Sequence, residues 1–373
     1  MKEVYPEDRR TGKRIVGYDL ARALAVFGMV VVNFKIVMGA GERGPVWLVD
    51  LISILSGRAA ATFVVLAGIG ISLLSRRSRI SGEKTLLRND RATLLRRAAF
   101  LFVVGLLYTP IWPADILHFY GIYIAVAAFL LAVSARRLWV TAGALVMGSA
   151  VLVVTLDYSR EWNWQTLDYS GFWSPSGMLR HLFFNGFHPV IPWLAFLLFG
   201  MIIGRQNVED SAVRRRIFWW GAVVALATEG LSRLLVNGLS VGAGPEDRET
   251  IIALLGTGPM PPLPLYMLAG AGTAAAVIAA MVSLGLRYEN SIWLRPLEAT
   301  GQLALSLYVA HVVIGMSFLE SIARLHDQTL WFSLFASAVF CSVGMAFASV
   351  IRRKFKRGPL EALMRLVTDP RRS

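Results

Sequence analysis

The stretch IVGYDLARALAVFGMVVVNFKI, residues 15–36, decides the fold class. Its 22 residues are enough for an α-helix to cross hydrocarbon ~30 Å thick, which takes roughly 20. Further apolar blocks of similar length follow, so the sequence predicts an all-α, polytopic transmembrane helix bundle of about ten helices. The expected spans are residues 15–36, 47–75, 98–112, 117–134, 138–156, 189–204, 217–237, 263–285, 301–319 and 330–350.

Composition and charge agree with a membrane protein. Hydrophobic residues make up 55% of the chain and charged residues 17%, against roughly 45–50% and about 25% in soluble domains. The net charge of +14 is segregated, because 29 Lys and Arg residues fall at the ends and in alternate loops and only five in the other loops. Positive charge resists translocation. We therefore expect cytoplasmic N- and C-termini, multi-pass insertion in the cell inner (cytoplasmic) membrane, and a lipid bilayer as partner, with no nucleic acid.

A single membrane domain is the simplest partition. We expect a cytoplasmic N-terminal segment at 1–14, a transmembrane domain at 15–350 and a basic cytoplasmic tail at 351–373. The second span contains Gly57-Arg58, which predicts a broken or tilted helix. The outer loop 157–188 is rich in aromatic side chains, which either cap a pocket or anchor the loop at the membrane interface.

Ionisable side chains inside spans point to function, because each costs roughly 2.5–3.5 kcal/mol on insertion scales. Asp19 and Arg22 are three residues apart, on one helix face, and are expected to pair. Asn33 lies eleven residues beyond Arg22, or ~16 Å further along the helix. Arg58 is expected to line a polar cavity, whereas Lys35 is expected to snorkel to the outer surface.

Two histidines are predicted at the same outer end of the bundle as Asn33. They are His118, at the start of the fourth span, and His188, just before the sixth. A neutral imidazole there is suited to act as a general base near pH 7. The alternative for each is a hydrogen bond between helices. His311 lies within the ninth span, and Glu229 and Arg233 in the seventh are expected to pair. No metal-ligand spacing occurs, so no metal is expected.

The first span resembles the first helix of the bacterial YeiB family in residues 18–25 and 30–33. That family is related to the transmembrane acyltransferases of the heparan-α-glucosaminide N-acetyltransferase type. The resemblance implies that 15–350 is an acyltransferase-like domain. The other segments that carry it are 63–70, 116–121, 192–201, 261–266 and 358–361.

The resemblance implies transfer of an acyl group, most simply acetyl, from cytoplasmic acyl-CoA to a hydroxyl or amine of a sugar, lipid or metabolite. No cofactor other than this co-substrate is implied. The oligomeric state and the acceptor stay open. The expected roles are catalysis for Asn33, His118 and His188, acyl-CoA binding for Asp19, Arg22, Arg58 and Arg205, and substrate contact for Lys35, Tyr120, Trp193 and His311.

One departure from the family pattern bears on the mechanism. In the heparan enzyme the catalytic histidine follows the asparagine by eleven residues, and that position here is Gly44. Either another base serves, with His118 or His188 as candidates, or the chain does not perform that chemistry. The alternative functions are a transporter or permease for a small amphiphilic metabolite, whose pathway the same buried charges would line, and a non-catalytic membrane partner or sensor.

Overall fold

The computed structural model describes residues 14–368 apart from 165 and 290, and nearly all regular structure in that part of the chain is helical. A two-stranded antiparallel sheet, Trp162–Asn163 against Asp168–Tyr169, lies in the long aromatic loop. The elements of the first half are α1 Val16–Val37, α2 Val46–Ser53, α3 Arg58–Leu74, α4 Arg76–Ser81, α5 Lys84–Tyr108, α6 Leu117–Phe129, α7 Ala135–Thr155, β1 Trp162–Asn163, β2 Asp168–Tyr169, α8 Pro175–Arg180 and the π-helix η1 His181–Asn185.

The second half begins with α9 and closes with a short helix that packs back on the bundle. Its elements are α9 Val190–Ile203, α10 Ser211–Leu239, α11 Pro245–Leu255, α12 Pro264–Arg287, α13 Arg295–Gln302, α14 Ala304–Ala310, the π-helix η2 His311–Met316, α15 Ser317–Ser321, α16 Leu330–Lys354 and α17 Pro359–Thr368.

The structure confirms a helical membrane bundle. Each of the ten expected spans contains a helix. Within the described residues, seven helices are long and apolar enough to cross a membrane, or up to eight if the bent pair Pro175–Asn185 and Val190–Ile203 forms one span. The remaining two expected spans are the apolar second half of α5 and α6, which has 13 residues. These two helices pack against each other.

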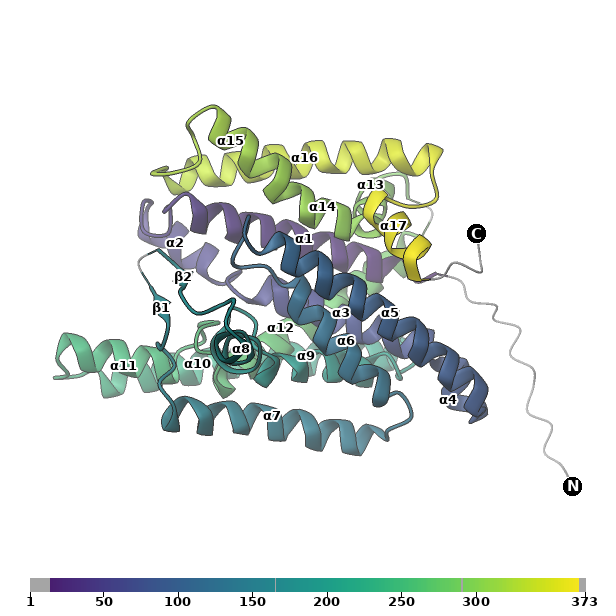
Figure 1. Cartoon of the computed structure of the whole chain (residues 1–373), viewed down its shortest axis with the longest axis horizontal. Helices are drawn as coiled ribbons and strands as arrows, with labels where there is room; N and C mark the ends of the chain where they lie inside the picture. Colours follow the sequence, from purple (N-terminus) through teal and green to yellow (C-terminus); the bar gives the residue numbers. More distant parts are fainter. Residues whose placement is uncertain (1–13, 165, 290, 369–373) are drawn as a thin grey trace, which may run out of the picture.

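The connecting segments sort to two ends as the charge pattern predicts. In Figure 1, α4 and α17, which belong to basic segments, lie at one end, and α2, α11 and the β-hairpin lie at the other. At the basic end the Arg96 guanidinium donates to the Thr368 carbonyl over 3.3 Å. We call this the inner end, and we call the end with the hairpin the outer end.

The second span is interrupted where Gly57-Arg58 predicts a break. α2 ends at Ser53 and α3 begins at Arg58. Gly57 has φ of 73°, a left-handed conformation that favours glycine. Its carbonyl accepts a hydrogen bond from the Tyr266 hydroxyl at 3.1 Å, and a Cβ at this position would lie 2.6 Å from that hydroxyl. The break therefore brings the start of α3 against α12.

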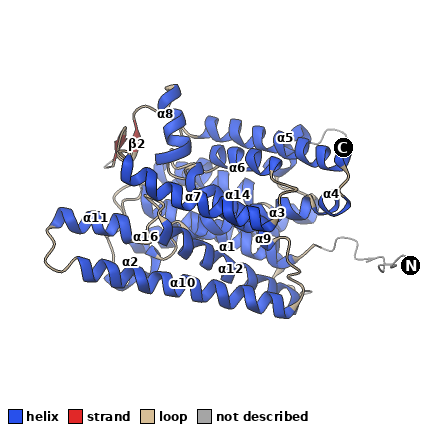
Figure 2. Cartoon of the chain, turned by 90° about the horizontal axis from the view of Figure 1, so that it is seen from below, coloured by secondary structure: helices blue, strands red, loops and turns tan. Residues whose placement is uncertain are grey.

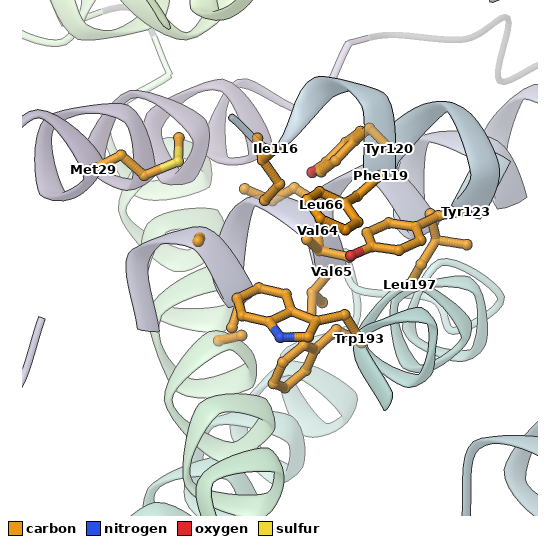
Figure 3. Packing of buried hydrophobic residues seen from close by; sticks show 14 of the residues in the cluster. Met29, Val64, Val65, Leu66, Ile116, Phe119, Tyr120, Tyr123, Trp193 and Leu197 are labelled. Carbon is orange, nitrogen blue, oxygen red and sulfur yellow. The ribbon is translucent and has the colours of Figure 1, made fainter. Parts of the chain in front are cut away.

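The core is centred on α3, α6 and α9 (Figure 3). The side chains of Phe119, Tyr123 and Trp193 are fully buried there, against Val65 of α3 and Leu197 of α9. These large aromatic rings fill the volume between the helices at this point. At other points small residues let the helices approach closely.

The C-terminal helix α17 closes over the start of α14. Glu361 accepts hydrogen bonds from the backbone N–H groups of Leu305 and Ser306 at 2.8 and 3.1 Å and from the Ser306 hydroxyl. A carboxylate at a helix N-terminus satisfies N–H groups that have no partner within the helix. Glu361 thereby fixes the entry of α14, the helix that leads directly into His311.

Candidate active site

A cavity of about 210 Å³ lies toward the outer end of the bundle. Its lining comes from the second half of α1, the start of α3 and the outer loops. Leu167 and Phe187 of the aromatic loop are among the lining residues, so part of this loop borders a pocket. The polar side chains on the wall are Asn33, His188 and Tyr308.

Asn33 is bound to His311, which stands 278 residues further along the chain. The Asn33 side-chain nitrogen lies 2.9 Å from Nε2 of His311, and His311 is completely buried. Nδ1 of His311 contacts the Tyr308 carbonyl. A carbonyl can only accept, so Nδ1 carries the proton and Nε2 accepts from the Asn33 amide. His311 thus orients Asn33 and leaves the second amide N–H and the amide oxygen of Asn33 for other partners.

Nothing in the sequence pointed to this pair beyond the mid-span placement of His311. The position at which the family carries its histidine, Gly44, lies against Leu330, where an added Cβ would be 3.0 Å from the Leu330 Cβ. The histidine that contacts Asn33 comes instead from η2, a π-helical turn that follows α14. Such turns occur frequently at functional sites.

His188 lies on the cavity wall in the short link between η1 and α9. Its backbone carbonyl accepts from the Tyr123 hydroxyl, and its ring packs edge-on against Trp193 with centroids 4.6 Å apart. Trp193 is therefore a neighbour of the cavity wall and does not line the cavity itself. The structure places Asn33 and His188 on the wall of one cavity and binds His311 to Asn33, although the three come from segments distant in sequence.

His118 lies behind this wall. Its Nδ1 is 3.0 Å from Asp115, whose carboxylate also accepts from the His118 backbone N–H at 3.1 Å. Both residues are buried, and Nε2 of His118 has no hydrogen-bond partner among the described residues. Ala114 and Ile116, on either side of Asp115, line the cavity. The Asp115 carboxylate fixes the Nδ1–H tautomer and leaves Nε2 as the basic atom.

His181 is a residue that the sequence placed only in a loop. It is buried, and its ring centroid lies 6.0 Å from that of His118, with Phe119 packed beside both.

Nearby in the loop, burial and the Glu161 carboxylate raise the pKa of Tyr169 to about 12. Tyr169 therefore stays neutral at physiological pH and donates to Asn185 over 3.1 Å.

The acidic and basic residues of α1 form a separate cluster at the inner end. Asp19 is almost fully buried and accepts from Arg22 at 2.8 Å and from Arg14, which confirms the expected pairing with Arg22. Arg22 also reaches the Gly301 carbonyl at 3.5 Å. Arg205 donates to the Val133 carbonyl at 2.6 Å, just beyond the end of α6. These cations lie at the end opposite to the cavity.

Two other candidates are not on the cavity wall. Lys35 donates to the Ser56 hydroxyl over 3.3 Å. Tyr120 is buried, tilted against Phe63 with centroids 5.6 Å apart, and its hydroxyl has no partner among the described residues. No group of three or more His, Cys, Asp or Glu side chains in the described part of the chain is arranged to hold a metal ion.

Arg58 forms an ion pair between helices. Its guanidinium lies 2.8 Å from the carboxylate of Glu229 on α10, and that carboxylate also binds Thr257 at 2.8 Å and Arg233 at 3.4 Å. The pair of Glu229 and Arg233 that the sequence predicted is confirmed. Although its neighbour Gly57 lines the cavity, Arg58 itself is engaged with α10 and does not line the cavity.

Glu229→Leu is expected to lower the free energy of unfolding by about 2 kcal/mol, because it leaves the buried Arg58 without a carboxylate. The matched control is Arg233→Leu, since the Arg233 side chain is 68% exposed and exposed pairs contribute about 1 kcal/mol or less. Thermal unfolding in detergent measures both variants. Equal midpoints for the two would contradict a structural role for the pair of Arg58 and Glu229.

Comparison with known families covers almost the whole chain. Residues 14–236 match the family described as heparan-alpha-glucosaminide N-acetyltransferase, catalytic. Residues 205–371 match a family described only as a protein of unknown function, DUF418. The first match holds the cavity residues Asn33 and His188 and the inner cluster, and the second holds His311. No curated protein is similar enough to the chain to count as a match.

Proposed function

The chain belongs to the heparan-alpha-glucosaminide N-acetyltransferase catalytic family, and from this premise we propose that it transfers an acetyl group from cytoplasmic acetyl-CoA to a hydroxyl or amine held in the outer cavity. The family supplies the coarser statement, a membrane acetyltransferase-like function. The observation that supports the finer proposal is that Asn33, which is bound to His311, and His188 line one cavity of about 210 Å³.

In the proposed reaction the acceptor oxygen or nitrogen attacks the thioester carbonyl carbon of the acetyl group. His188 takes the proton that the acceptor loses. The second amide N–H of Asn33 stabilises the negative charge that develops on the carbonyl oxygen. The C–S bond then breaks, and the proton passes to the departing thiolate. The products are the acetylated acceptor and CoA as a free thiol.

The donor would approach from the inner end. Arg22 keeps 28% of its side chain exposed while it holds Asp19, and a guanidinium is suited to charge-assisted hydrogen bonds with phosphate. From Arg22 to Asn33 the thioester arm has to span ~16 Å along α1. Tyr120 has a buried hydroxyl with no partner among the described residues. It therefore offers a polar contact on this route.

The test uses the full chain in liposomes with acetyl-CoA labelled in the acetyl group. An amino sugar is the first acceptor, because the family's named enzyme acts on a glucosaminide, and sugar alcohols and glycerolipids follow. We expect one free thiol for each acetyl group that appears on the acceptor. Failure to bind acetyl-CoA would contradict the proposal. Efflux of a small amphiphile from loaded vesicles without thiol release would support the alternative of a transporter.

His311→Phe is expected to lower kcat about 10- to 100-fold, because loss of the Nε2 acceptor lets the Asn33 amide turn away from its catalytic orientation. His311→Gln should restore part of the rate, since its side-chain oxygen can accept from the same amide. In an Asn33→Ala background, His311→Phe should cause little further loss, because the two act as one unit. His326→Phe, at an exposed histidine, is the control.

Additive losses for His311→Phe and Asn33→Ala would contradict this positioning role. So would equal rates for His311→Phe and His311→Gln, because a purely space-filling role does not depend on an acceptor atom.

A further inference from the structure

A second and larger cavity lies on the side of the bundle, away from the proposed active site. It is a groove of about 730 Å³ along α7, α9, α10 and α12. Figure 2 shows these helices running alongside one another, with α7 and α10 toward the viewer. None of the residues that line it lines the outer cavity. The groove and the outer cavity are therefore separate sites.

Small residues line part of the groove, among them Gly143 on α7 and Ala271 on α12. Gly221 on α10 and Gly272 on α12 also line it, and they let these two helices pack closely, because a Cβ at either would lie 2.7 Å from backbone of the other helix. A Cβ added at Gly143 would meet no atom within 4 Å, so no other helix of the chain fills the space beside it. Trp220, on the rim, is 67% exposed. Since these helices are membrane spans, the groove opens sideways into the hydrocarbon.

The polarity of the lining is concentrated at one end. Along the groove the side chains are aliphatic or aromatic, and the exceptions are Gln206, just after α9, and Arg216, near the start of α10. Both belong to the basic segment 205–216 at the inner end. The groove thus pairs an apolar channel in the hydrocarbon with an exposed cation at the level of the inner headgroups.

We propose that this groove binds an anionic phospholipid of the inner leaflet, with one acyl chain in the channel and the phosphate on Arg216. The apolar lining matches an acyl chain. Charge complementarity selects the headgroup, because a Lys or Arg near the membrane surface attracts anionic lipid and a guanidinium binds phosphate through paired N–H donors. A helix of a second copy would fill the channel and leave Arg216 without an anion.

The experiment reconstitutes the full chain in vesicles of equal parts phosphatidylglycerol and phosphatidylcholine, extracts it into detergent, and weighs the protein with its bound lipid by native mass spectrometry. We expect one retained phospholipid per chain, with phosphatidylglycerol favoured. Arg216→Gln should reduce that preference about fivefold. Arg215→Gln, on the same helix but outside the groove, should leave it unchanged.

A second pair of variants tests the acyl channel independently of the charge. Gly143→Phe places a ring in the groove and should abolish lipid retention. Gly148→Phe, on the same helix and also with no atom within 4 Å of its Cβ position, does not line the groove and should retain lipid as the unaltered chain does. Thermal midpoints and size-exclusion profiles confirm that each variant is folded.

Three results would overturn the proposal. One is equal retention of the two lipids by the unaltered chain. Another is equal lipid retention by Gly143→Phe and Gly148→Phe. The third is a dimer of the unaltered chain that Gly143→Phe converts to a monomer with its bound lipid unchanged, which would assign the groove to a second copy. All three are independent of acetyl transfer.

Discussion

Asn33→Ala is expected to lower the rate of acetyl transfer about 100-fold, the usual loss when one donor to a developing oxyanion is removed, and to leave acetyl-CoA binding intact. The reason is the geometry of the amide. One N–H is held by His311 at 2.9 Å, and the other is free to meet the carbonyl oxygen as it becomes negative. Steady-state rates and equilibrium binding of acetyl-CoA, measured in liposomes, separate the two effects.

Asn33→Asp sharpens this test because it preserves volume and removes both N–H donors. Its carboxylate would face the lone pair of His311 Nε2, so it should be as slow as Asn33→Ala. Ile36→Ala is the control from the same helix, since Ile36 lines the cavity without a polar group. If Asn33→Asp kept the normal rate, Asn33 would merely fill space and the proposed mechanism would be wrong.

Local features of the fold were predictable because they depend on neighbours in sequence. The spans follow from runs of apolar residues, because a chain segment of this kind satisfies its backbone polar groups within the bilayer by forming a helix. The pairing of Asp19 with Arg22 follows from a spacing of three and that of Glu229 with Arg233 from a spacing of four. The break at Gly57 follows from a glycine beside a charge in an otherwise apolar span.

The contacts that make the candidate site were not predictable, because they join distant parts of the chain. Asn33 and His311 are 278 residues apart and Arg58 and Glu229 are 171 apart, and periodicity carries no information about either pairing. The sequence identified Asn33, His188 and His311 as polar residues out of place. It could not show that the first two share a cavity, or that Arg58 is held by α10.

From the sequence we expected Asp19, Arg22 and Arg58 to bind acyl-CoA and Asn33 to act in catalysis, with Arg58 on a polar cavity. The structure gives each its own partners: Arg14 and Arg22 for Asp19, His311 for Asn33, and Glu229 for Arg58. The clusters around Asp19 and Arg58 are ion pairs, and ion pairs can join helices in a bundle that contains no polar channel. Only Asn33 lies on the cavity, so the proposal of acetyl transfer now rests on that cavity and on the family.

Gly68→Ala is expected to destabilise the protein by about 3 kcal/mol or more, because it forces apart two helices whose backbones touch. A Cβ at Gly68 on α3 would lie 2.0 Å from the Leu197 carbonyl oxygen of α9, and a Cβ at Gly200 would lie 2.0 Å from the Val65 carbonyl oxygen of α3. Small residues permit this close approach between membrane helices. Thermal unfolding in detergent measures the loss.

Gly70→Ala separates this effect from the intrinsic cost of replacing a glycine in α3. Gly70 lies two residues from Gly68 on the same helix, and a Cβ there meets no atom within 4 Å. Alanine is the better helix former by up to about 1 kcal/mol, so Gly70→Ala should be as stable as the unaltered chain or slightly more stable. α9 begins two residues after His188, so separation of α3 from α9 should also move His188 away from Asn33. Gly68→Ala should therefore lose activity even where it folds. If Gly68→Ala and Gly70→Ala had the same stability and the same activity, α3 and α9 would not pack this closely.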